Sequence, residues 1–226
     1  MTQKTESEAL FERFCDSNGL PLRSVPRQSD TEVKTPDYEV RLGDTHLVVE
    51  VKQLDLGPKD KVHLKELEER RETPFVVNEK VARIRKKIKD AMPQLKAASS
   101  ESNPTMLVLY DSVRLLGDID GLDVRVALYG DEVVDIGVPS DPAVPAYVKE
   151  HRFGGNRSVS ISHNTSLSSI GVLHSIPDSE TNLDIYHNDF AANPLDPELL
   201  RVPSIQHFRL EPTVTQGAFR RWIQVE

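Results

Sequence analysis

A short apolar hairpin between residues 36 and 52 constrains the fold of this chain more than any other segment. Apolar and polar residues alternate on its first side, and Gly43-Asp44 is a two-residue turn of the kind that closes tight hairpins. With that turn as the loop, the predicted pairs are Leu42/Thr45, Arg41/His46, Val40/Leu47, Glu39/Val48, Tyr38/Val49 and Asp37/Glu50. Because side chains alternate along a strand, one face of the hairpin is predicted to be apolar and the other charged. The apolar face would carry Tyr38, Val40, Leu42, Leu47, Val49 and Val51, and the charged face Asp37, Glu39, Arg41, His46, Glu50 and Lys52.

The charged face brings two carboxylates together. Asp37 and Glu50 would lie directly opposite each other, with β-carbons roughly 5 Å apart, where like charges destabilise a sheet. A divalent cation is the natural compensation, since Mg²⁺ takes carboxylate oxygens and retains several waters. Lys52 would lie beside the metal, where it could hold or help deprotonate an attacking water or offset charge on the phosphate. This set of residues predicts hydrolysis of a phosphodiester.

A chance origin of the motif is the alternative. Pro-Asp is common in turns and Glu-x-Lys occurs in any charged chain, and a second copy, Glu32-Val33-Lys34, stands just upstream. That copy follows a polar segment and has no Pro-Asp before it. The copy at Glu50-Val51-Lys52 ends the apolar run Leu47-Val48-Val49, and this context supports the hypothesis of a site.

Two helices and a buried strand are predicted around the hairpin. The first helix runs from about Thr5 to Asp16 and includes Cys15, which is expected to be a small buried residue. The second runs from 78 to 98, with Pro93 near its end. The apolar run 105–111 is typical of a strand buried on both faces. Because a helix joins two strands here, we expect a right-handed crossover and a mixed sheet.

The second half of the chain is predicted to consist of strands. They are expected at 124–129 and 132–138, around a Gly130-Asp131 turn, and at 159–162, 169–173 and 183–186. The charged segment 55–71 is expected to be solvated surface or a partly helical lid. The predicted fold class is therefore α/β, with a mixed central sheet flanked by helices and a β-rich C-terminal extension.

The charge of the chain is unfavourable for a protein that binds nucleic acid. Its net charge is −8, and nonspecific binding of an acidic chain to a polyanion is weak. The segment 80–89 is nevertheless strongly basic. On a helical wheel, one flank beside the apolar stripe would carry Lys80, Arg83, Lys87 and Gln94. This flank is either a phosphate-contacting surface or a solvated helix face, and both interpretations stay open.

Several functional classes are disfavoured by missing patterns. The single cysteine excludes a disulfide framework. The N-terminus lacks the pattern of a signal peptide, and no apolar run approaches the roughly 20 residues of a membrane span. We therefore expect a cytoplasmic protein without a membrane partner. The histidines form no HxH or HExxH pattern, and no GxSxG is present, which argues against a zinc site and a hydrolase triad.

Taken together, these motifs resemble the PD-(D/E)xK nuclease superfamily. The matching elements are a first helix with glutamate, the segment Thr35-Pro36-Asp37-Tyr38, the segment Glu50-Val51-Lys52-Gln53, and then a basic helix and a strand ending at Asp111. The resemblance covers about residues 5–112. It implies a restriction-endonuclease-like core in residues 1–112, with residues 113–226 as a β-rich extension that completes the same domain.

The resemblance also implies an activity and its residues. It implies an Mg²⁺- or Mn²⁺-dependent nuclease, an endonuclease acting on nucleic acid and more readily on DNA, with a homodimer possible. The implied metal ligands are Asp37, Glu50 and the carbonyl of Val51. The implied catalytic residues are Asp37, Glu50, Lys52 and the helix-one glutamate Glu8, for which Glu12 is the competing position.

Two other classes of function remain open. The same fold can serve as a catalytically silent module that binds nucleic acid or a protein partner. The presence of all three motif residues, Asp37, Glu50 and Lys52, speaks against this, because an inactive site can lose any of them. The chain could also be a structural component of a larger assembly, which the acidic charge favours.

Overall fold

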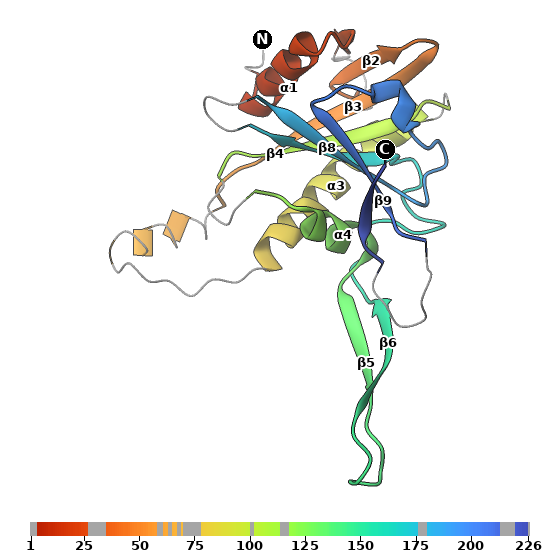
Figure 1. Cartoon of the computed structure of the whole chain (residues 1–226). Coiled ribbons are helices and arrows are strands. Elements are labelled where there is room, and N and C mark those ends of the chain that lie inside the picture. The colour runs from red at the N-terminus through yellow and green to blue at the C-terminus, as the bar shows by residue number, and fades with distance from the viewer. Residues whose placement is uncertain are drawn as a thin grey trace.

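The protein is an α/β molecule built on a large mixed sheet, which three helices flank among the described residues. The computed structural model describes residues 4–26, 35–57, 61–62, 65–66, 69, 78–99, 102–113, 118–175, 180–212 and 220–225. The three helices are α1 (Glu6–Ser17), α3 (Asn78–Ala98) and α4 (Gly121–Tyr129). Helix α1 covers one face of the sheet, and α3 and α4 cover the other (Figure 1). Within the described ranges, no helix is both long and apolar enough to cross a membrane.

The main sheet has eight strands in the order β1-β2-β3-β4-β7-β8-β9-β10. Neighbours pair in parallel at β3–β4, β4–β7 and β8–β9 and antiparallel elsewhere, so strands from both halves of the chain form one sheet. The strands are β1 (Leu22–Ser24), β2 (Tyr38–Leu42), β3 (Thr45–Leu54), β4 (Thr105–Asp111), β7 (Ser169–His174), β8 (Asn182–His187), β9 (Ile205–Leu210) and β10 (Trp222–Val225). A separate two-stranded ribbon consists of β5 (Glu132–Gly137) and β6 (Tyr147–Phe153).

The register of the β2–β3 hairpin is as predicted from the sequence. All five pairs between Tyr38/Val49 and Leu42/Thr45 are present. Gly43 has φ of +63°, the left-handed backbone that a tight turn requires and that glycine adopts without steric cost. Asp37 lies one residue before β2, so its predicted pairing with Glu50 is not part of the ladder. Its carboxylate instead accepts a hydrogen bond from the backbone N–H of Val51, at 3.0 Å.

The crossover from β3 to β4 is also confirmed. Helix α3 has the predicted bounds, and β4 is buried along its whole length between two parallel neighbours. The stripe Ile84, Ile88, Ala91 and Leu95 is at most 1% exposed and packs on the sheet. Pro93 lies within α3, where it cannot donate a backbone hydrogen bond.

The two sides of the hairpin belong to two different cores. The apolar face of β2 and β3 packs with α1 residues, among them Phe11, Phe14 and the fully buried Cys15. Burial raises the pKa of the Cys15 thiol to about 12, which makes it an inert packing residue, as predicted. The opposite face of β3, which carries Glu50, lies under α3. The charged face is thus buried at Glu50, whereas Arg41 and His46 near the turn are exposed.

Two predicted strands are wrong. Residues 124–129 form most of α4, because Asp120 and Asp123 make a reciprocal capping box that starts a helix. The strand at 159–162 reduces to an isolated bridge between Ser160 and His163. The strand after Gly130 exists as β5, but it pairs with β6. The predicted segment 55–71 lies largely outside the described residues.

The capping box of α4 can be tested by substitution. Asp120→Ala removes the oxygen that accepts the Asp123 N–H, at 2.9 Å, and should lower the free energy of unfolding by about 1 kcal/mol. Asp120→Asn keeps a capping oxygen, so its free energy of unfolding should fall clearly less than that of Asp120→Ala. Chemical denaturation of both variants measures the difference, and equal stabilities would contradict a capping role for this side chain.

Candidate active site

The candidate site centres on a buried carboxylate in the middle of β3. The Glu50 side chain is fully buried. Its Oε1 accepts hydrogen bonds from the Lys52 ammonium on the same strand and from Gln94 Nε2 on α3, the latter at 2.7 Å. Its Oε2 is buried and has no hydrogen-bond partner among the described residues. A buried carboxylate oxygen left in this state is costly unless another group binds it.

A second carboxylate lies beside the first. Asp37 stands where the chain enters β2, and the bond from the Val51 N–H fixes its carboxylate against β3 next to Glu50. Burial raises the pKa of Glu50, and the negative charge of Asp37 and a side-chain interaction between the two carboxyl groups raise it further. The hydrogen bond and charge of Lys52 act in the opposite direction. The outcome is a pKa of about 7 for Glu50, far above the usual value near 4.5.

These groups fit a hard divalent cation. The described part of the chain holds no cluster of three or more His, Cys, Asp or Glu side chains placed around a metal site. Any cation here would therefore rely on Asp37, Glu50 and the carbonyl of Val51, with water completing its shell. Mg²⁺ is commonly held in this way, by one or two carboxylates with several retained waters. The unpartnered Glu50 Oε2 supplies the oxygen that such an ion needs.

Basic side chains of β3 and α3 lie near the carboxylates of Asp37 and Glu50. The side chain of Lys52 is 25% exposed, so this residue connects the fully buried Glu50 carboxylate with the solvent. Burial lowers the pKa of Lys87 on α3; the Asp55 carboxylate opposes this shift and the Lys52 charge adds to it. Arg83 Nη2 donates to the carbonyl of Asp55, at 2.6 Å, just beyond β3. Arg83 and Lys87 thus lie at the carboxyl end of β3, near Lys52.

The predicted basic flank of α3 is divided by the structure. Lys80 is 7% exposed, forms an ion pair with Asp123 at 2.9 Å and donates to the carbonyl of Asp118. It ties α3 to the start of α4, and a contact of Lys80 with nucleic acid stays a prediction. Gln94 is also buried, and its position beside Glu50 makes it a positioning residue for the carboxylate. Arg83 and Lys87 remain as partly exposed cations.

The two candidate glutamates of helix α1 have structural partners. Glu8 closes the capping box of α1, where its Oε2 accepts from the Thr5 N–H at 2.7 Å. Glu12 accepts from Lys4 and from the Tyr38 hydroxyl, at 3.0 Å. Helix α1 covers the sheet face opposite to α3 (Figure 1). A catalytic part for Glu8 stays a prediction.

Two further polar residues lie at the end of β3: Gln53, which closes the motif segment, and Asp55, which sequence reasoning did not single out. Gln53 Oε1 accepts from the Ser7 N–H of α1, at 3.0 Å, and its Nε2 donates to Asp55 Oδ1, at 2.6 Å. The Ser112 hydroxyl after β4 donates to the carbonyl of Leu54. These contacts fasten α1 and β4 to the end of β3. The sequence carries a signal for this cluster, since Asp55 and Ser112 directly follow two strands that pair in parallel. The carboxyl ends of such strands meet at one edge of the sheet, which brings these residues together.

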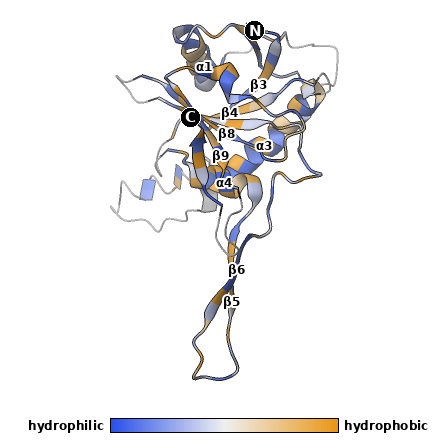
Figure 2. Cartoon of the chain, turned by 45° about the vertical axis from the view of Figure 1, so that its right-hand side comes forward, coloured by the Kyte–Doolittle hydropathy of each residue, from blue (hydrophilic) through white to orange (hydrophobic). Residues whose placement is uncertain are grey.

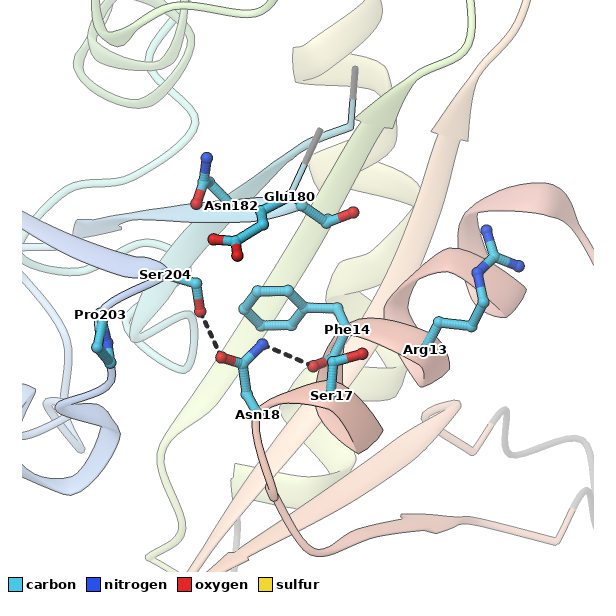
Figure 3. A pocket seen from close by; sticks show the side chains of 9 residues that line it. Arg13, Phe14, Ser17, Asn18, Glu180, Asn182, Pro203 and Ser204 are labelled. Carbon is cyan, nitrogen blue, oxygen red and sulfur yellow. Dashed lines mark hydrogen bonds between the residues drawn. The ribbon is translucent and has the colours of Figure 1, made fainter. Parts of the chain in front are cut away.

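Two cavities lined by described residues lie away from this site. The larger, of about 550 Å³, lies at the end of α1 and is lined by Arg13, Phe14, Ser17, Asn18, Glu180, Thr181, Asn182, Pro203 and Ser204 (Figure 3). There Asn18 accepts from the Ser204 hydroxyl, at 2.6 Å, and joins α1 to the β8–β9 region. The other, of about 370 Å³, lies along the far flank of α3 beside Arg85 and Lys89. Neither cavity is lined by Asp37, Glu50 or Lys52.

Comparisons of this chain with protein-family models, with curated proteins and with solved structures give no match. The interpretation of the site therefore depends on its own residues and their chemistry.

The raised pKa of Glu50 makes stability depend on pH. The unfolded chain releases this proton near pH 4.5 and the folded chain near pH 7, so metal-free protein should lose stability as the pH rises between these values. Glu50→Gln cannot ionise, and its free energy of unfolding should exceed that of the wild type by more at pH 8 than at pH 5. Glu150→Gln, on an exposed strand, is the control. Denaturant titrations at the two pH values measure this, and an equal difference at both would refute the raised pKa.

Proposed function

We propose that this protein is a metal-dependent nuclease that hydrolyses phosphodiester bonds of nucleic acid, DNA in the first instance, with Mg²⁺ or Mn²⁺. The observation that carries the proposal is the buried Glu50 carboxylate, with one unpartnered oxygen, beside Asp37 and Lys52. The order of elements, from α1 through the β2–β3 hairpin and α3 to β4, supports a restriction-endonuclease-like core. We also propose that residues 113–226 complete the same domain and that the protein works in the cytoplasm.

The carboxylates would hold the ion and position it. A bound Mg²⁺ supplies positive charge that polarises a phosphoryl oxygen and lowers the pKa of water. Gln94 holds Glu50 Oε1, whereas no hydrogen-bond donor among the described residues reaches Oε2. The Val51 N–H holds Asp37 Oδ2 in the same way. Both carboxylates are thus oriented before any ligand arrives, which is the arrangement that electrostatic catalysis needs.

Lys52 would act on the water and the phosphate. Its ammonium carries three donors, one of which is used by Glu50. The remaining donors can orient an attacking water or stabilise negative charge on the phosphate in the transition state. Lys87 adds a second positive charge near Lys52, since the Lys52 ammonium is among the charges that lower the pKa of Lys87.

The substrate would approach from the flank of α3. Arg83 and Lys87 supply cations at the end of β3 where the site opens, and phosphate contacts of this kind position a nucleic acid without reading its sequence. The net charge of −8 limits nonspecific binding, so binding should depend on this local surface and weaken with salt.

A catalytically silent binding module is the second candidate. The ion pair that Lys52 makes with Glu50 favours it, because this pair satisfies the lysine without a metal. Such a module would bind nucleic acid through Arg83 and Lys87 and cleave nothing. Binding without cleavage in the presence of Mg²⁺ and Mn²⁺ identifies it.

Cleavage assays test the proposed function. Wild-type protein should cut single-stranded, duplex or branched nucleic acid in Mg²⁺ or Mn²⁺ and should be inactive with a chelator. Asp37→Ala and Lys52→Ala should each lose about a hundredfold or more in rate, since each removes a group that acts on the reacting atoms. Lys149→Ala changes an exposed lysine on β6 and should leave the rate unchanged.

Contaminating nuclease is controlled by the same variants. All proteins are purified in parallel, and equal cleavage by wild type and Asp37→Ala assigns the activity to a contaminant. If the wild type cuts no substrate in either metal, the proposal of an active nuclease fails.

A further inference from the structure

The cavity on the far flank of α3 has a lining of one charge sign. It lies between α3 and the segment that follows β6, and its volume is about 370 Å³. Its lining includes Arg85 and Lys89 of α3 and Arg157 and His163 of that segment. Among the described residues, no carboxylate lines it. In a chain with a net charge of −8, this local excess of positive charge favours an anionic ligand.

Helix α3 gives the cavity an apolar floor beside its cations. Arg85 and Lys89 are four residues apart and therefore lie on the same side of the helix. The side chains of Ile88 and Met92 also line the cavity and are only 1% and 8% exposed. Figure 2 shows both hydrophobic and hydrophilic residues along α3. A ligand here would meet charged groups at one end and an apolar surface at the other.

Arg85 is held in place before any ligand binds. Its Nη2 donates to the carbonyl of Val126, at 2.9 Å, and to Asp131 Oδ1, at 2.7 Å. Its buried Nε has no hydrogen-bond partner among the described residues. Asp131 offsets one of the three permanent positive charges of the lining and leaves two. The guanidinium is thus fixed at one end, and its hydrogen-bonding capacity is only partly used.

Arg157 is also held in a defined position. Its Nε donates to the carbonyl of Gly154, at 3.0 Å, and its Nη2 to the carbonyl of Phe153. Farther along the same segment, Asn164 has φ of +53°, a left-handed backbone that asparagine tolerates. Its Nδ2 donates to the carbonyl of Ser158, at 2.7 Å. These contacts give the segment a fixed shape, and it presents Arg157 to the cavity.

Two further donors of the lining are unpartnered. Lys89 and His163 are exposed, and their side chains make no hydrogen bond or ion pair with the other described residues. They face the same cavity from α3 and from the segment after β6. The cavity therefore combines two fixed guanidinium groups with two side chains that can close on a ligand.

This lining suits a phosphate monoester. Such a group carries a charge between −1.5 and −2 at about pH 7 and has three strong acceptor oxygens. Guanidinium groups match its oxygens with paired donors, and an ammonium adds a point charge. A phosphodiester inside a strand has a single charge and nucleotides on both sides. The volume lies at the low end of the roughly 300–1,000 Å³ of ligand pockets, which favours a small molecule or a strand end.

We propose that this cavity binds a phosphate monoester, with the phosphate oxygens on Arg85, Lys89 and Arg157 and the organic part over the apolar floor. A free nucleotide and the phosphorylated end of a nucleic-acid strand both present this chemistry. The site is separate from Asp37 and Glu50, which lie on the other flank of α3. The proposal does not depend on nuclease activity.

Calorimetric titration in the presence of a chelator tests the phosphate site, because no metal-dependent cleavage can then occur. AMP should bind at least tenfold more tightly than adenosine. Lys89→Ala should weaken AMP binding about tenfold, since it removes a charge-assisted hydrogen bond, and Lys89→Glu should abolish it. Lys86→Ala removes another exposed cation of α3, outside the cavity, and should bind AMP as the wild type does. Asp37→Ala should also bind AMP normally, which separates this site from the carboxylates.

Two oligonucleotides, with and without a 5′-phosphate, distinguish the sources of the ligand. Binding of AMP identifies a free nucleotide, and tighter binding of the phosphorylated oligonucleotide identifies a strand end. Thermal unfolding checks that the Lys89 variants are folded. The proposal is overturned if neither AMP nor the phosphorylated oligonucleotide binds better than its counterpart without phosphate. It is equally overturned if Lys89→Glu binds AMP as tightly as the wild type.

Discussion

The burial of the Glu50 carboxylate under α3 is the constraint on which the rest of the site depends. A carboxylate in the interior is unfavourable unless its charge is compensated, and here a second carboxylate lies next to it. Lys52 and Gln94 both donate to Oε1, so the hydrogen bonds that compensate the buried charge reach only one of the two oxygens. Oε2 receives no hydrogen bond from the described residues. Asp37 is held by the Val51 N–H and cannot simply turn away from Glu50 without losing that bond. This unbalanced arrangement is what gives the site its proposed affinity for a divalent cation.

Helix α3 supports both the carboxylate site and the β5–β6 ribbon. Its inner stripe packs on the sheet, and one flank brings Gln94 to Glu50 and Lys87 to the end of β3. Arg85, on the other flank, holds Asp131 at the base of the ribbon. One helix thus fixes the position of the site and of the base of the ribbon.

The parts of the fold that were predictable from the sequence are those set by local patterns. The register of β2 and β3 follows from alternation and a Gly43-Asp44 turn, and the bounds of α3 follow from its apolar period. Residues 124–129 were misjudged because Val124 and Val126 favour strands, whereas the capping box of Asp120 and Asp123 starts a helix there. Strands β1, β6, β9 and β10 were not predicted, since three of them are short or mostly exposed and lack a clear alternation.

Only the part of the candidate site that lies on the β2–β3 hairpin was predictable from the sequence. Asp37, Glu50 and Lys52 are brought together by register, which the sequence carries. The roles of Gln94 and Lys80 depend on how α3 sits against β3 and α4, and such contacts between distant residues have no local signature. The same holds for Glu8 and Glu12, whose partners Thr5 and Tyr38 are fixed by the cap and the packing of α1.

Crystallography with Mn²⁺ tests most directly whether Asp37 and Glu50 hold a divalent cation. Crystals grown in MnCl₂ should show an anomalous difference peak between these two carboxylates, with Glu50 Oε2 and the carbonyl of Val51 among its ligands. Crystals of Asp37→Asn under the same conditions should lack the peak. A wild-type structure at saturating Mn²⁺ without an ion at this position, with Lys52 still paired to Glu50, would contradict the claim.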